Sequence, residues 1–372
     1  MTNEVLTYID SHADTAFDLL CELAQIPAPS NHEQLRAEFC LNWLQSHGAE
    51  AAYIDEALNV IYPIGDTGGN DLMVFMAHSD VVFPDTAPLP LQVENGRIYC
   101  PGVGDDTANA VALLTAAGYI AEHGLTPKNC GVLLVINSGE EGLGNLKGSR
   151  KIMADFGHRV KEFITFDGNA TAIVNKAVGS RRFKVTISTE GGHSYARFGA
   201  PNAIAQLSRL ISRLYEIEVP PMGKTTYNVG TISGGTSVNT IAQNAEMLFE
   251  FRSDEREGLA IMQREFDRIV EEFRGSGVQI DIQVVGDRPC GIDVDNSPLV
   301  ARAAQAVENH YGFTPHTAPG STDCNVPLSM GIRAICPGCV LGTGAHTREE
   351  SVEISSLLPG LKVAFELILH HF

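Results

Sequence analysis

Residues 131–142 read GVLLVINSGEEG, an apolar run that ends in glycine and two adjacent glutamates. The run GVLLVIN is rich in Val, Leu and Ile, which is typical of a strand buried on both faces of a parallel sheet. In an open α/β sheet, ligands collect outside the carboxyl ends of the strands. Glu140 and Glu141 therefore stand where a functional site is expected.

Two more apolar runs end in candidate ligands. LMVFMA, residues 72–77, is followed by His78 and Asp80, and EFITF, residues 162–166, is followed by Asp167. Such runs alternate with predicted helices, for which the sequence favours residues 1–24, 32–48, 106–123, 297–311 and 354–370. This alternation predicts an α/β fold with a mixed, mostly parallel sheet and helices on both faces.

The pattern changes near Gly179. From there to about residue 288, alternating strands and two amphipathic helices follow one another in the order β-α-β-β-α-β. The second of these helices is predicted over residues 256–275. This order is that of a ferredoxin-like α+β domain, so residues 179–288 are expected to form a domain inserted between residues 1–178 and 289–372.

Length and charge limit the possible functions. A chain of 372 residues is too long for one ordinary core and too short for three, so two domains are expected. The formal net charge of −19 disfavours nucleic acid and membrane as partners, because both are bound chiefly by Lys and Arg. No apolar stretch approaches the roughly 20 residues that span a bilayer, and no signal-peptide pattern is present, which favours a cytoplasmic protein.

Five segments end in residues that ligate metals in other proteins. They are MAHSD, GVGDD, GEEG, FDG and GAHT, and the candidate ligands are His78, Asp105, Glu141, Asp167 and His346. Paired ions in hydrolases lie roughly 3.5 to 4 Å apart and share a carboxylate, and each ion also takes an imidazole and another carboxylate. Three carboxylates and two imidazoles meet that minimum. Two divalent ions are therefore predicted, with zinc favoured by the donor set and cobalt or manganese as alternatives.

Two further acids lie beside these ligands. Asp80 is two positions beyond His78, so in an extended chain its carboxylate can accept the second ring N–H of that histidine. A turn cap is the alternative for Asp80. Glu140 precedes Glu141 between two glycines that permit a turn, so it can take a proton from a metal-bound water. The alternative for the glutamate pair is a helix N-terminus, where acids are favoured.

The motifs HSD, GVGDDTANAV, EEG, FDG, GGHS, GGTSVN and GAHT occur in the order seen in the M20 family of metallopeptidases. The chain resembles that family over nearly its whole length, and the motifs are specific together rather than singly. Members include carboxypeptidase G-like, aminoacylase-like, succinyl-diaminopimelate desuccinylase-like and tripeptidase T-like enzymes. The resemblance implies a zinc-exopeptidase-like catalytic domain, with the insert serving as a lid through which a homodimer forms.

The resemblance also implies how the ligands are shared. Asp105 would bridge both ions, His78 and Asp167 would bind one of them, and Glu141 and His346 would bind the other.

Glu140 becomes the general base and Asp80 the residue that orients the first histidine. Asp105 is preferred to Asp106 because it matches the first aspartate of the family's D-x-K pattern. Thr107 stands where lysine is common, so the chain departs from the pattern at that position.

The insert contributes three candidates through the same resemblance. His193 in GGHS matches a lid histidine that reaches the partner's active site in dimeric relatives and stabilises an oxyanion. A turn histidine is the alternative. Asn239 and Arg252 resemble residues that receive the substrate carboxylate, for which a guanidinium is well suited. The alternative for Arg252 is an exposed strand residue that faces Glu250 or Asp254.

The segment APGSTDCNVP resembles a loop that lines the family's substrate pocket, which makes Ser321 and Asp323 candidate pocket residues. It matches neither of the common nucleotide-binding glycine motifs.

These features together predict a two-metal hydrolase that cleaves an amide bond in a small peptide, with metal-bound hydroxide as nucleophile and Glu140 as base. A deacylase of N-acyl amino acids is the rival within the hydrolases. A non-catalytic peptide-binding protein is the alternative of another class, although a binder has no use for a base.

Overall fold

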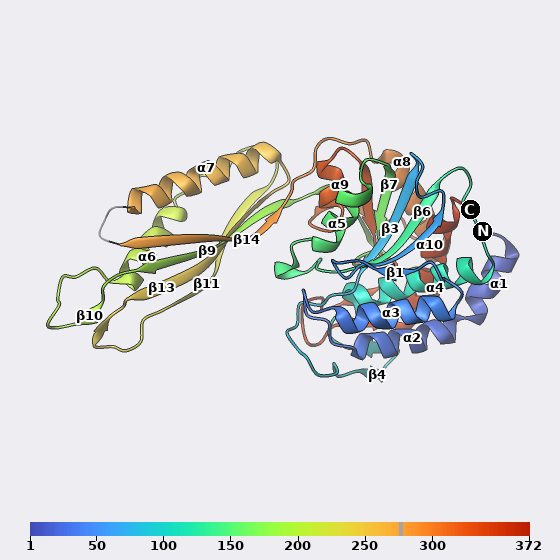
Figure 1. Cartoon of the computed structure of the whole chain (residues 1–372), viewed down its shortest axis with the longest axis horizontal. Coiled ribbons are helices and arrows are strands. Elements are labelled where there is room, and N and C mark those ends of the chain that lie inside the picture. The colour runs from blue at the N-terminus through green and yellow to red at the C-terminus, as the bar shows by residue number, and fades with distance from the viewer. Residues whose placement is uncertain (275–277) are drawn as a thin grey trace. The chain divides into compact units, whose positions relative to one another are not determined.

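The computed structural model describes residues 1–274 and 278–372. The chain divides into two compact units, drawn in Figure 1. Unit 1 comprises Met1–Ala177 and Ile292–Phe372, and unit 2 comprises Val178–Gly291. The chain therefore leaves unit 1 once and returns to it. The function of unit 2 as a lid or dimerisation domain stays a prediction.

Unit 1 is built on one sheet of eight strands in the order β1-β2-β6-β3-β7-β16-β8-β15. The four neighbours in its centre are parallel, namely β6 (Gly131–Asn137), β3 (Leu72–His78), β7 (Val160–Thr165) and β16 (Arg333–Pro337). One edge is antiparallel, with β2 (Val60–Gly65) and β1 (Tyr53–Ile54). At the other edge, β8 (Ala172–Ala177) runs antiparallel to β16 and parallel to β15 (His316–Gly320). The predicted mixed, mostly parallel sheet is confirmed.

Helices cover both faces of this sheet. One face shares a core with α1 (Asn3–Ser11), α2 (Ala13–Gln25), α3 (Gln34–Ser46), α4 (Ala108–Glu122), α8 (Ser297–Tyr311) and α10 (Leu357–Leu369). The other shares a core with α5 (Lys147–Phe156) and α9 (Asn325–Ser329). Val74 belongs to the second core and its neighbour Phe75 to the first, which explains why β3 is apolar from Leu72 to Ala77. No helix of the described chain is long and apolar enough to cross a membrane.

Two predicted helices begin or break differently in the structure. The helix expected over residues 1–24 is two helices separated at His12, whose ring stacks on Tyr8 at a centroid distance of 3.8 Å. The backbone N–H of His12 bonds to the carbonyls of Tyr8 and Ile9, which closes α1. The helix expected from residue 106 begins only at Ala108, because residues 103–107 form a separate turn with non-helical backbone angles.

A small antiparallel sheet in unit 1 was not predicted. Its strands run in the order β17 (Gly342–Thr343), β18 (Ser351–Glu353), β5 (Arg97–Tyr99) and β4 (Gln92–Glu94). Strands this short carry too little periodicity to be recognised in a sequence. The sheet matters for function because the loop between β17 and β18 carries His346.

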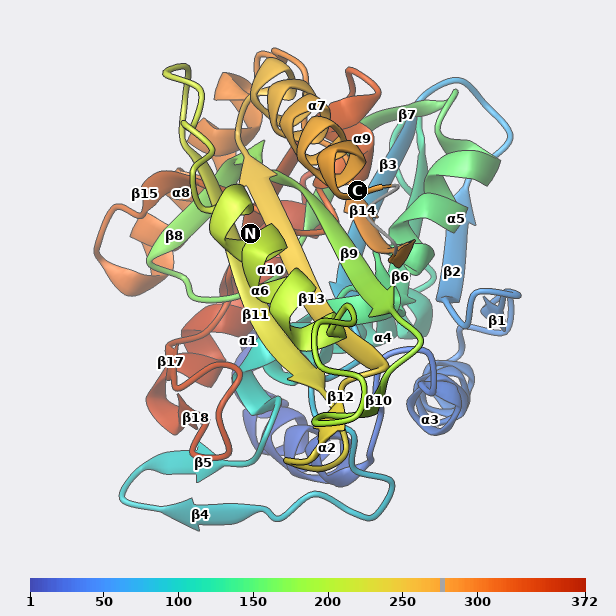
Figure 2. The ribbon, with the colours of Figure 1, turned by 90° about the vertical axis from the view of Figure 1, so that its left-hand side faces the viewer.

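Unit 2 has the predicted β-α-β-β-α-β order. Its antiparallel sheet has the strand order β11 (Thr225–Gly234), β13 (Asn244–Ser253), β9 (Gly179–Ser188) and β14 (Gln279–Arg288). The helices α6 (Ala203–Leu214) and α7 (Arg256–Phe273) cover one face of it (Figure 2). The ferredoxin-like arrangement is confirmed. The end predicted for the second helix, Gly275, lies outside the described residues.

Aromatic rings form the centre of the unit 2 core. The ring of Phe266 in α7 stacks on Phe183 of β9 at a centroid distance of 4.4 Å and on Phe249 of β13 at 5.5 Å. All three side chains are buried. Phe266 therefore ties the helix to two strands.

We expect Phe266→Ala to lower the free energy of unfolding by about 3–5 kcal/mol, because it removes buried apolar surface and leaves a cavity. Leu35→Ala is the control, since Leu35 is 56% exposed. Urea unfolding of the two variants and the parent protein measures the difference. Equal losses in both variants would contradict this view of the core.

Candidate metal centre

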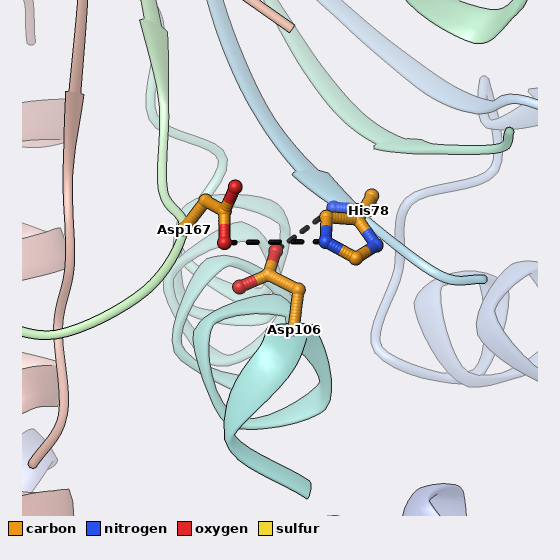
Figure 3. A group of neighbouring side chains, drawn as sticks. All are labelled: His78, Asp106 and Asp167. Atoms are coloured by element: carbon orange, nitrogen blue, oxygen red, sulfur yellow. Dashed lines mark hydrogen bonds and ion pairs between the residues drawn. The ribbon is translucent and has the colours of Figure 1, made fainter. Parts of the chain in front are cut away.

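The candidate ligands gather at the carboxyl ends of three adjacent parallel strands. His78 is the last residue of β3, while Glu141 follows β6 and Asp167 follows β7. Asp105 comes from the turn that precedes α4. Figure 3 shows His78 and Asp167 reaching toward each other from the ends of their strands, with Asp106 at the start of the helix close to both. Parallel pairing brings these ends together although the residues are far apart in sequence.

Asp105 lies between two imidazoles. Its Oδ1 is 3.1 Å from Nε2 of His78, and its Oδ2 is 3.1 Å from Nε2 of His346. The same Nε2 of His346 is 3.0 Å from Oε1 of Glu141. The carboxylate of Asp105 thus faces two imidazole nitrogens, one with each oxygen. This is the arrangement expected of a carboxylate shared by two metal ions.

His346 reaches this point through an unusual backbone conformation. Its φ is +64°, in the left-handed region that few residues other than glycine adopt. The side chain is 57% exposed, and its contacts are with Asp105 and Glu141. Left-handed residues that are not glycine concentrate at functional sites, because the surrounding structure must hold them there.

Asp167 and Asp106 form the second part of the cluster (Figure 3). Asp167 Oδ1 is 4.0 Å from Nε2 of His78. Asp106 is fully buried and accepts the backbone N–H of His78 at 2.9 Å and Nδ2 of Asn109 at 2.6 Å. His78, Asp106 and Asp167 offer ligand atoms within 4.8 Å of one another, as do His78, Asp105 and Glu141.

Asp106 is therefore a carboxylate of the site that the sequence analysis set aside. Both of its oxygens already accept hydrogen bonds from the protein, whereas Asp105 contacts both histidines. This difference favours Asp105 over Asp106 as the shared ligand. The peptide bond that joins the two residues is cis.

Two of the crowded carboxylates have pKa values above the usual range. Burial and the neighbouring charge of Asp105 raise the pKa of Asp167 to about 8. Burial also raises the pKa of Asp106 well above its usual range. Hydrogen bonds to Asp105 and Glu141 raise the pKa of His346 to about 10. The negative charge at this site is thus larger than its imidazoles can balance.

Divalent cations fit this donor set. Two imidazoles and several carboxylates face one another within a few ångströms, and cations would relieve the repulsion that raises their pKa values. Cys336 is outside the two groups of candidate ligands, and burial raises the pKa of its thiol well above the usual range. Its Sγ bonds instead to the carbonyl of Asp167 at 3.6 Å.

Asp80 holds the glutamate pair as well as the first histidine. Its Oδ1 is 3.5 Å from Nδ1 of His78, and its backbone carbonyl is 3.1 Å from the same atom. Its two carboxylate oxygens accept the backbone N–H groups of Glu140 and Glu141, each at 2.9 Å. Ser30 Oγ, which the sequence analysis did not single out, donates to Asp80 at 2.7 Å. Asp80 therefore links the ends of β3 and β6.

Glu140 and Glu141 lie on a turn rather than in the first turn of α5. Gly139 has φ +65° and Gly142 has φ +46°, and α5 begins only at Lys147. Both glutamates are 5% exposed. The expected glycine turn is present, and Glu141 also directly precedes a one-turn 3-10 helix, Gly142–Gly144.

Glu350 holds the turn that carries Asp105, and the sequence analysis missed it. Its Oε1 accepts the N–H groups of Gly104 and Asp105 at 2.7 and 2.8 Å, and its Oε2 accepts that of Gly102 at 2.8 Å. Burial raises the pKa of Glu350 to about 7, although the three N–H donors by themselves would lower it. Its place four residues after His346 was the only available signal, because its partners lie some 245 residues away in the chain.

A cavity of about 140 Å³ opens beside Asp105 within unit 1. Asn169, Val340, Thr343 and Glu350 are among the residues that line it. It offers room for a small group next to the shared carboxylate.

In unit 2 the structure brings His193 and Asn239 together. The short strand β10 (Gly192–His193) pairs with β12 (Thr240–Ile241), and the N–H of Ser194 donates to the carbonyl of Asn239 at 3.0 Å. His193 is exposed, and its Nδ1 accepts the N–H groups of Tyr195 and Ala196 at 3.3 and 3.4 Å. These contacts are those expected for a turn histidine.

Arg252 faces Glu250, as its alternative predicted. Its Nε and Nη2 donate to the two oxygens of that carboxylate at 2.9 and 3.1 Å, and Arg182 donates to it at 3.2 Å. Asn239 lies in the turn before β12 and Arg252 lies on β13, and no described contact joins them.

Ser321 and Asp323 lie between β15 and α9 in unit 1. Asp323 is buried and accepts Nδ2 of Asn137, the last residue of β6, at 2.7 Å. This contact ties the loop to the carboxyl edge of the sheet. A role for Ser321 in substrate binding stays a prediction.

Comparison with known proteins agrees with this geometry. The family model described as peptidase family M20/M25/M40 matches residues 74–370. A succinyl-diaminopimelate desuccinylase of Stenotrophomonas maltophilia is 24% identical over 79% of this chain and 82% of its own.

Two solved structures share the fold. A tripeptidase of Staphylococcus aureus has a TM-score of 0.75 at 22% identity, covering 96% of this chain and 97% of its own. A dinuclear metal-binding peptidase of Bacillus subtilis has a TM-score of 0.62 at 15% identity, covering 98% of this chain and 100% of its own.

In the metal-free protein we expect stability to fall as the pH rises from 6.5 to 8. The pKa of Asp167 is raised from its ordinary 3.8 to about 8 and the pKa of His346 from its ordinary 6.5 to about 10, so both groups hold their protons to higher pH in the folded state. The folded state thus binds more protons in this window, so raising the pH favours unfolding. The effect of Asp167 is at most about 1.4 kcal/mol per pH unit. That of His346 is smaller, because solvent screens its exposed side chain.

Thermal unfolding in the presence of a chelator measures this slope. His346→Gln should reduce it, and added zinc should reverse it, because a metal displaces the protons and binds more tightly as the pH rises. A metal-free protein that gains stability over this range would show that the cluster does not hold protons as described.

Proposed function

Because the chain belongs to peptidase family M20/M25/M40, we propose that it is a two-metal hydrolase that cleaves an amide bond in a small peptide, as a di- or tripeptide exopeptidase. The observation that carries the proposal is one carboxylate, Asp105, placed between His78 and His346. The adjacent Glu140 and Glu141 share the same edge of the sheet. The base and the ligands that hydrolysis needs therefore come from one edge.

His78 and Asp167 would hold one ion, and Glu141 and His346 the other, with Asp105 shared. The contact of His346 with Glu141 at 3.0 Å and the approach of Asp167 to His78 at 4.0 Å support this division. The dinuclear centre of the Bacillus subtilis peptidase supports the number of ions. Zinc is proposed because imidazole and carboxylate suit it, with cobalt or manganese as alternatives.

Two ions bound here would polarise the scissile carbonyl and lower the pKa of a water molecule. Glu140 would take the proton from that water and deliver it to the leaving amine. Its backbone N–H is fixed by Asp80, and the glycine turn sets it apart from Glu141. Because Asp80 holds both glutamates and contacts His78, the base and one ligand are aligned by the same carboxylate.

Unit 2 carries three residues for which a role is also proposed. His193 would donate a hydrogen bond to the developing oxyanion, a contribution that is commonly large. Asn239 and Arg252 would receive the substrate carboxylate, for which Arg252 would have to share its guanidinium between substrate and Glu250.

A homodimer through unit 2 is also proposed. Tyr195 and Phe198, in the loop after His193, are 89% and 92% exposed, and Val238 beside Asn239 is fully exposed. Large apolar side chains gathered in this way favour contact with another protein surface. A cytoplasmic location remains a prediction of the sequence.

A deacylase of N-acyl amino acids is the second candidate, and the 24% identity with the desuccinylase supports it. Both reactions break an amide bond, so the metal centre serves either. A non-catalytic peptide-binding protein remains the alternative of another class. The buried Glu140 opposes it, because burying an acid that has no chemical use is costly.

We expect Glu140→Ala to bind both metal ions as the parent protein does and to lose about 10²- to 10⁴-fold in kcat, because only the proton acceptor is removed. Elemental analysis and steady-state kinetics measure the two quantities. Glu218→Ala, an exposed glutamate in unit 2, is the control. Parent-like turnover in the Glu140 variant would rule out its role as base.

A substrate panel should separate peptidase from deacylase. If the enzyme recognises a free amine, di- and tripeptides should be cleaved faster than their N-acetyl and N-succinyl counterparts. The comparison uses kcat/KM for matched pairs with the fully metallated protein. A preference for blocked substrates would establish the deacylase, and binding without any product would favour the non-catalytic protein.

A further inference from the structure

A buried arginine lies behind the metal centre. Arg36, near the start of α3, is 1% exposed, and its guanidinium donates four hydrogen bonds. The acceptors are the carbonyls of Ile26 at 2.8 Å, Ser79 at 3.0 Å and Ala24 at 3.3 Å, and Oγ1 of Thr107 at 3.0 Å. Every one of these acceptors is neutral.

Burial of this charge without an ion pair is unusual. In the described part of the chain, no carboxylate forms an ion pair with the guanidinium of Arg36, for which an N···O distance of 4.0 Å or less is needed. Burial lowers the pKa of Arg36 to about 10, so it keeps its charge at neutral pH. Among the acids that act on it are Asp80 and Glu350, which raise its pKa. A buried cation is costly unless its surroundings compensate it, so the four hydrogen bonds that hold this one call for a function.

Two of the four hydrogen bonds join the loops that bear His78 and Asp105, and the other two go to the end of α2. Ser79 lies between His78 and Asp80, and Thr107 follows Asp105 by two positions. Thr107 also donates to the carbonyl of Gly102 at 2.6 Å, at the start of the same turn. A single side chain thus fixes the backbone at the end of β3 and the turn before α4.

Thr107 is also the position at which this chain departs from the lysine of the D-x-K pattern. Its hydroxyl lies 3.0 Å from Nη1 of Arg36 and is fully buried. A lysine there would bring a second cation against the guanidinium in a site closed to water. The buried space between these loops therefore accommodates one positive charge, at position 36 or at position 107 but not at both.

We propose that Arg36 is a positioning residue for the metal centre, and that it supplies from α3 the buried positive charge that this chain lacks at position 107. The metal part of this inference rests on the proposed function, but its test needs no substrate. Zinc affinity and the melting temperature of the protein can be measured whether or not the protein turns over a substrate.

The test is a double-mutant cycle of Arg36→Leu and Thr107→Lys. Arg36→Leu removes the tether and should weaken zinc binding by about 10- to 100-fold, the usual cost of losing a group that orients ligands. Thr107→Lys alone places two cations together and should lower the melting temperature of the metal-free protein. The double variant restores one charge and should regain most of both losses, so the effects of the single changes should not add.

Zinc affinity, measured by competition with a chelating dye, and the melting temperature of metal-free protein are the two readouts. Arg159→Leu is the matched control: Arg159 donates to the carbonyl of Thr67 at 2.7 Å, away from both loops. It should change stability without changing zinc affinity. A purely structural role for Arg36 would lower the melting temperature but leave the affinity intact.

The proposal is overturned if Arg36→Leu binds zinc like the parent, or if the double variant shows the sum of the two single effects. If Arg36→Leu does not fold, recovery of folded protein on adding Thr107→Lys supports the proposal, and continued failure to fold overturns it. Loss of turnover with intact zinc binding in Glu140→Ala would leave this result unaffected, so the two proposals can fail separately.

Discussion

The mutual repulsion of buried carboxylates is the constraint on which the rest of unit 1 depends. Asp105, Asp106 and Asp167 crowd around His78 at the carboxyl edge of the sheet, and protons on Asp167 and His346 show how much negative charge remains to be balanced. Acids held this close would separate in a flexible chain. A continuous hydrogen-bonded sheet is rigid enough to keep them together until cations arrive.

The groups behind the ligands do most of this holding. Asp80 accepts the backbone N–H groups of both glutamates, and Glu350 accepts three from the turn that carries Asp105. Carboxylates placed behind the ligands in this way fix the backbone but add further negative charge. The buried Arg36 binds both loops through the carbonyl of Ser79 and the hydroxyl of Thr107, so it fixes the same backbone with a positively charged side chain.

Much of the fold follows from local pattern. β6 has the predicted bounds because a strand buried on both faces must be apolar throughout, and the order of unit 2 follows from alternating strands and amphipathic helices. The division of the first helix at His12 and the small sheet of β4, β5, β17 and β18 were missed. The break at His12 comes with a single local contact, the stacking of His12 on Tyr8, and the small sheet joins short strands far apart in the chain, so neither leaves a periodic signal.

The sequence by itself determined which residue types stand at the ends of the apolar runs. A buried strand and the candidate ligand that follows it are neighbours in the chain, so both can be recognised from a short stretch of sequence. It also identified Thr107 as a departure, without a reason. Only the tertiary structure decided that Asp105 faces both histidines, that Asp106 is a buried neighbour, and that Arg36 meets Thr107. These are distances between segments far apart in the chain, and such distances are set by packing of the whole unit rather than by any one segment.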